Sequence, residues 1–118
     1  MQKGFNALGG SNGAIDRTAA SIKNLVDQTD LYRTATKAAL AGIPEINKNF
    51  QLIAETAPKV AEAPAKNAAG AIDEFVNAIA RANPRVLQMY GINIKGLSEE
   101  IPLQEKRRII LKQIADLN

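Results

Sequence analysis

The chain contains no cysteine, no histidine and no tryptophan in its 118 residues. The first two absences remove thiolate nucleophiles, imidazole acid–base groups and the ligands of nearly all transition-metal sites. The lack of cysteine also excludes a disulfide framework. We therefore expect a protein that is not an enzyme. It should have no catalytic, cofactor-binding or metal site and no small-molecule substrate.

Aromatic residues are scarce as well, at 4%, whereas 46% of the chain is apolar. A chain of this length and apolar content is sufficient for one ordinary domain. Because few large side chains are present to fill a wide interior, we expect thin helix layers in close contact. The aromatic residues available to the core are Phe5, Tyr32, Phe50, Phe75 and Tyr90.

Long hydrophobic runs are missing too. The first ten residues lack the apolar stretch of a signal peptide, and no segment approaches the ~20 apolar residues of a membrane span. Residue 2 is Gln2, whereas myristoylation requires glycine at that position. We expect no signal peptide, no transmembrane segment, and a soluble cytoplasmic or virion protein.

Glycine is concentrated at the start of the chain, where Gly4, Gly9, Gly10 and Gly13 occur without a periodic apolar pattern. Such a segment is costly to order. We predict that residues 1–13 form a flexible N-terminal arm and that residues 14–118 form a single helical-bundle domain.

Helical periodicity dominates the rest of the sequence. Ile15, Ala19, Ile22 and Val26 recur at the spacing of an amphipathic helix, which predicts a helix over residues 14–29. Further helices are predicted over residues 31–42, 45–82 and 102–117, with a short helix between Asn83 and Gly91. The third of these should break near Pro58 to Pro64, leaving a possible hinge at residues 57–66. The predicted fold is all-α, a small antiparallel helical bundle of four main helices plus a short fifth.

The second predicted helix carries a nearly flush face of small side chains. Ala35, Ala38 and Gly42 follow Leu31 along one side of it. Small faces permit close approach of two backbones. The face is either packed within the bundle or a contact surface for self-assembly or a partner helix.

The net charge of +3 resides in the last third of the chain, where residues 81–118 hold seven basic and four acidic side chains. Within the last helix, Arg108 and Lys112 share the polar face with Glu105 and Asp116, as on a solvated surface. An alternative is nucleic-acid binding, with phosphate contacts from the basic residues of this region. Those candidates are Arg85, Lys95, Lys106, Arg107, Arg108 and Lys112.

Arg107 and Ile109 are misplaced on the predicted last helix. Arg107 projects into its apolar stripe, where a guanidinium must snorkel, pair with a carboxylate or reach across an interface. Ile109 projects to the outer side. This pattern indicates a helix with contacts on more than one face. If Arg107 reaches a neighbouring chain, Arg107→Ala should reduce association.

The composition is similar to that of helical proteins that assemble or are translocated in bacterial and phage machines. We expect a structural or protein-interaction subunit of such an assembly, which self-associates or binds a protein partner through helix faces. A translocated effector or secretion-signal domain is a further alternative. The predicted interaction residues are Ala35, Ala38, Gly42, Lys106, Arg107, Arg108, Ile109 and Lys112.

Overall fold

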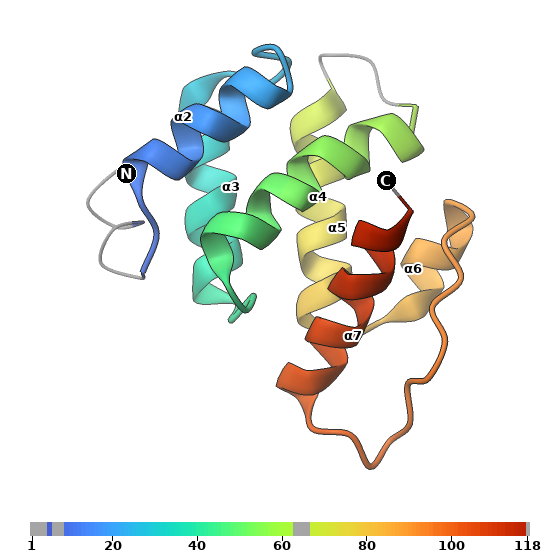
Figure 1. The fold of residues 1–118 in the computed structure, drawn as a ribbon. Helices are drawn as coiled ribbons and strands as arrows, with labels where there is room; N and C mark the ends of the chain where they lie inside the picture. Colours follow the sequence, from blue (N-terminus) through green and yellow to red (C-terminus); the bar gives the residue numbers. More distant parts are fainter. Residues whose placement is uncertain (1–4, 6–8, 63–66, 118) are drawn as a thin grey trace.

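The computed structural model describes residues 5, 9–62 and 67–117, and this part of the chain forms six α-helices without a strand (Figure 1). The predicted all-α class is therefore confirmed. The helices are α2 (Asn12–Ser21), α3 (Gln28–Leu40), α4 (Ile46–Val60), α5 (Ala68–Ala80), α6 (Pro84–Met89) and α7 (Leu103–Asp116).

Helix α2 is shorter than its apolar spacing predicts. The Ser11 hydroxyl accepts a hydrogen bond from the Ala14 amide and caps the start. Lys23 and Asn24 then adopt left-handed backbone conformations, and the Asn24 amide donates to the Ala19 carbonyl. The predicted helix over residues 14–29 is thus wrong at its end. Val26 lies in the segment that follows α2, but its side chain is still buried in the core.

The predicted segment 45–82 contains two helices, α4 and α5. Pro58 lies in the last turn of α4, and the helix continues through it to Val60 although proline has no amide to donate to the carbonyl four residues earlier. The chain turns at Glu62, which has a left-handed backbone. Residues 63–66 of the predicted hinge lie outside the described residues. The count of four main helices is corrected to five in the described chain, beside the short α6.

The predicted N-terminal arm differs from the structure wherever it can be compared. Residues 1–4 and 6–8 lie outside the described residues, and Asn12 and Gly13 already belong to α2. Phe5 is fully buried and meets the edge of Tyr32. A Cβ at Gly10 would overlap the Phe5 ring, so glycine permits this close approach.

The short helix α6 begins as predicted. The Asn83 side chain accepts a hydrogen bond from the Arg85 amide at 3.1 Å, and Pro84 occupies the first turn. The last helix, α7, lies within the predicted residues 102–117. The capping residues of α6 and the periodic apolar residues of α7 were therefore sufficient to predict these two helices.

The helices form a flat molecule with dimensions of 36 × 31 × 19 Å. Its shortest dimension equals about two helix diameters of ~10 Å. Helix α4 packs against α5 and α2, α3 packs against α5, and α7 contacts both α4 and α5 (Figure 1). Phe50, Ile53, Ile72 and Phe75 are fully buried between these helices. Helix α7 therefore lies at one side of α4, with α2 on the other side of the same helix.

Candidate interaction groove

Arg107 links α7 to the ends of two other helices in the same chain. Its Nε and Nη2 atoms donate to the Ala80 carbonyl at 2.9 and 2.7 Å, and Nη1 donates to the Gly42 carbonyl at 3.2 Å. Nη1 also donates to Gln104 Oε1 at 2.8 Å. The guanidinium is therefore hydrogen-bonded within its own chain in this structure, where its positive charge meets the carbonyls at the carboxyl ends of α3 and α5.

The small-residue face of α3 is also used within the chain. Ala35 and Ala38 are fully buried in the core, so they are not available to a partner in this structure. Gly42 has φ of +90°, and a Cβ there would lie 2.7 Å from Arg107 Nη1. Glycine at residue 42 therefore serves the turn after α3 and the approach of the guanidinium.

The other predicted interaction residues lie on α7 with differing exposure. Arg108 and Lys112 are exposed, whereas Lys106 and Ile109 are half-buried. Arg108 forms an ion pair with Glu105 at 3.7 Å, and both side chains are about half exposed. Arg108 and Lys112 thus remain candidates for a contact surface.

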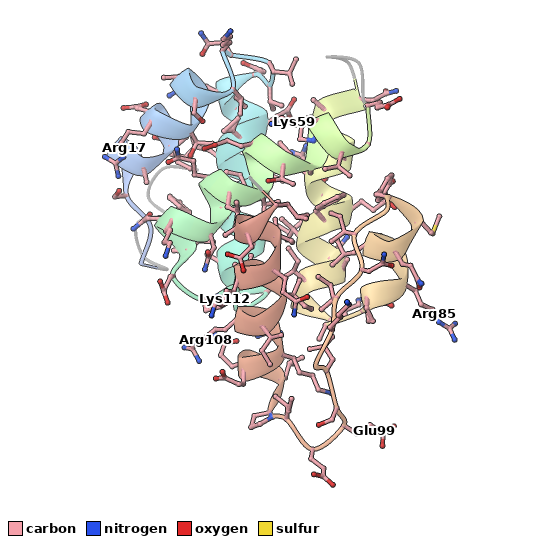
Figure 2. All side chains as sticks on the ribbon, turned by 45° about the vertical axis from the view of Figure 1, so that its right-hand side comes forward. Arg17, Lys59, Arg85, Glu99, Arg108 and Lys112 are labelled. Carbon is pink, nitrogen blue, oxygen red and sulfur yellow. The ribbon has the colours of Figure 1, made fainter. Side chains whose placement is uncertain are left out.

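The six basic residues of the predicted nucleic-acid surface do not gather on one face. Arg107 points into the molecule. Figure 2 shows Arg85 on the side of the molecule opposite Arg108 and Lys112. The structure therefore does not bring the predicted set together.

A groove of about 920 Å³ lies beside α4, between α2 and α7. Leu52 of α4 and Leu111 and Ala115 of α7 give it an apolar lining. Its charged lining comprises the basic residues Arg17, Lys48, Lys59, Arg108 and Lys112 and the acidic residues Glu45 and Glu55. Five positive and two negative side chains give the groove a net charge of +3.

Most of these positive charges lack an ion-pair partner in the described part of the chain. Arg17, Lys48, Lys59 and Lys112 form no ion pair with another described residue, and Arg108 alone is paired. Figure 2 shows Arg17, Arg108 and Lys112 on the same side of the molecule, with Lys59 above them. The groove therefore presents positive charge to any molecule that enters it.

The neutral polar residues of the groove are held by the fold. Asn49 Nδ2 donates to the Pro44 carbonyl at 2.6 Å. Asn47 Oδ1 accepts from the Ser11 amide at 3.0 Å, which ties the start of α2 to α4. The Asn47 bond fixes the start of α2 against α4, and neither bond uses a charged side chain of the groove.

Arg17, Lys48 and Lys59 were missed in the sequence because they lie in the part of the chain with balanced charge. Lys48 and Lys59 are 11 residues apart, which is three turns of a helix and places both on one side of α4. This spacing is the signal that could have found them. Nothing in the sequence joins that side to Arg17 or to α7.

Two tyrosines with raised pKa values lie outside the groove lining. Tyr90 donates to Glu74 Oε2 at 2.8 Å, and this hydrogen bond, followed by burial, raises the pKa of Tyr90. Burial and the nearby Asp16 raise the pKa of Tyr32. Both changes keep the phenols protonated, so these residues act as neutral structural groups.

Comparison with known proteins adds no relative: no protein-family model, curated protein or solved structure matches the chain. Among the described residues, no helix is both long and apolar enough to cross a membrane. The groove is therefore judged on its own geometry and charge.

Proposed function

We infer that this protein is a non-enzymatic interaction or structural subunit of a bacterial or bacteriophage assembly, built as an antiparallel helical bundle. Its contact surface is the groove between α2 and α7. The observation that carries this function is the combination of an apolar lining with basic side chains, most of which form no ion pair with another described residue. Such a surface suits a protein segment that carries both apolar and acidic side chains.

The apolar part of the groove favours a protein partner. Leu52 and Leu111 lie on facing helices, and Leu52 remains half-exposed in the isolated chain. Covering apolar surface stabilises a complex by roughly 25 cal/mol per Å² removed from water, before the entropy cost of association. A partner side chain between α4 and α7 would gain this term, whereas a bare phosphate would not.

The charge distribution supports the same conclusion. Glu45 and Glu55 lie among the basic residues, where they would repel a continuous polyanion. Among the residues that the structure describes, none of those lining the groove is aromatic and able to stack on bases. A partner with separated carboxylates can meet the lysines and avoid both glutamates.

A photo-cross-linking experiment tests this function. A photoreactive amino acid replaces Lys112 in the groove or, as a matched exposed control, Arg85 on the opposite side (Figure 2). In cells that make the protein, we expect a discrete protein adduct from residue 112 and none from residue 85. Equal labelling from both residues, or no adduct from either, would contradict the proposed role of the groove.

Nucleic-acid binding is the second candidate, favoured by the five basic residues of the groove. It differs from the sequence-based version, because only Arg108 and Lys112 are shared. Arg17, Lys48 and Lys59 stand in place of Arg85, Lys95, Lys106 and Arg107. A titration with short DNA and RNA at two salt concentrations separates the candidates. Phosphate contacts would give binding that weakens steeply with salt, and absence of binding at low salt would remove this candidate.

A further inference from the structure

The loop before α7 carries exposed negative charge at the end of the molecule. Glu99 and Glu100 are both exposed and form no ion pair with a described residue. In Figure 2, Glu99 lies at the lower tip of the molecule, beyond the body of the helices and pointing away from it. We call residues 97–101 the acidic loop.

The acidic loop is anchored to the helical body. The Gln113 side chain accepts from the Lys95 amide at 2.9 Å and donates to the Lys95 carbonyl at 2.7 Å. The Ile101 amide donates to the Ser98 carbonyl at 3.2 Å and closes a turn around Glu99 and Glu100. Because these bonds restrict the loop before binding, little further ordering is needed when it meets a partner.

We propose that the acidic loop of one copy docks in the basic groove of a second copy. Glu99 and Glu100 supply two negative charges, and the groove offers a net charge of +3 with four cations that form no ion pair with a residue in the described ranges. Leu103, which is 47% exposed just after the loop, supplies apolar surface beside the carboxylates. This inference rests on the proposed function and names the occupant of the same groove.

The arrangement is head to tail, because the loop and the groove are different surfaces of the same chain. A molecule cannot place its own loop in its own groove when Glu99 points away from the body (Figure 2). When two copies form one contact, one of them still has a free groove and the other a free loop. Further copies can therefore add to form a ring or an open chain.

The contact is weak and sensitive to salt. A five-residue loop buries much less surface than the ~1,600 Å² of a standard interface, so association should appear at high protein concentration. Charges at the surface are screened over ~8 Å at physiological ionic strength. We expect reversible self-association between about 10 µM and 1 mM that decreases as salt is raised.

Sedimentation of the full chain with two charge-reversal pairs tests the contact from both sides. The loop variant carries Glu99→Lys and Glu100→Lys, and the groove variant carries Lys48→Glu and Lys112→Glu. Each should weaken self-association by about tenfold or more, because at least two charge pairs become repulsive. The control variant, Arg81→Glu with Arg85→Glu, changes two exposed residues outside the groove and the loop, has the same net charge as the groove variant and should associate like the wild type.

Mixing the two variants gives the decisive result. The loop variant keeps a basic groove and the groove variant keeps an acidic loop, so the mixture should restore the association that each variant alone has lost. This outcome also shows that both variants are folded. A wild type that stays monomeric up to about 1 mM, or a loop variant that associates like the wild type, overturns the proposal. Cross-links from residue 112 to a different protein, with a monomeric wild type, would overturn it and leave the proposed function standing.

Discussion

Replacing Arg107 with alanine should destabilise the fold. The side chain donates four hydrogen bonds, three of them to the Ala80 and Gly42 carbonyls that end α5 and α3. A hydrogen bond from a charged group contributes ~1.5–3 kcal/mol, and a cation at a helix carboxyl end adds ~0.3–1 kcal/mol. Arg107 is half-buried, so water can replace part of this set. We expect Arg107→Ala to lower the free energy of unfolding by about 2–4 kcal/mol.

Urea unfolding followed by circular dichroism measures this change. The matched control is Arg108→Ala, which removes an exposed side chain paired with Glu105 and should cost about 0–0.5 kcal/mol. Arg107→Lys keeps the charge but cannot donate to both helix ends with the same planar geometry, so its cost should fall between the two. A loss below about 0.5 kcal/mol for Arg107→Ala would refute the intramolecular role.

Gly42 gives a second test of the same contact. Gly42→Ala combines the cost of a side chain at φ of +90° with a Cβ that pushes against Arg107 Nη1. In the Arg107→Ala background the steric part disappears and only the backbone part remains. A double-mutant cycle should therefore show that the two losses are less than additive, by about 1 kcal/mol. Additive losses would place the guanidinium away from Gly42.

Two further predictions concern other parts of the chain. Because the pKa of Tyr90 is raised on folding, its stabilising effect is complete below the unfolded pKa of about 10 and is lost as pH rises through the folded value. Tyr90→Phe should therefore reduce the fall in unfolding free energy between about pH 9 and 11.5, and an unchanged slope would contradict the assigned cause. Gln113→Ala removes the acceptor of the Lys95 amide, so hydrogen exchange at that amide should quicken by about tenfold or more. Lys112→Ala is the control, and equal protection in both variants would show that Gln113 does not anchor the loop.

The sequence was sufficient for helices whose apolar stripe and end signals agree. The predicted residues 102–117 contain α7, and Asn83 with Pro84 correctly predicted the start of α6. Agreement failed at α2, where Val26 continues the spacing although the helix has ended. Helix α2 ends because Lys23 and Asn24 adopt left-handed conformations, and the sequence has no glycine or proline there that would predict them.

Arg107 shows the limit of a single-helix projection. The projection correctly placed a cation within an apolar stripe, and burial then required polar partners. Those partners are backbone carbonyls 27 and 65 residues earlier in the chain, at Ala80 and Gly42. Every residue has a backbone carbonyl, so the residue types in the sequence do not show which carbonyls accept these hydrogen bonds. The projection of one helix therefore leaves open whether the partner lies in the same chain or in another, and Gly42, a glycine after a helix, is the sequence signal near the observed contact.

The groove could not be predicted from the sequence for a different reason. Net charge was counted along stretches of sequence, whereas the charge of the groove comes from residues on three separate helices. Residues 1–80 are neutral, yet Lys48 and Lys59 share one side of α4. Arg108 and Lys112, one turn apart, share one side of α7. Each helix taken alone offers two positive charges, as an ordinary solvated face would. Packing α7 and α2 on either side of α4 brings those faces and Arg17 around one apolar lining. Screening permits charges within about one Debye length to act together, so it is this arrangement that can select an acidic partner.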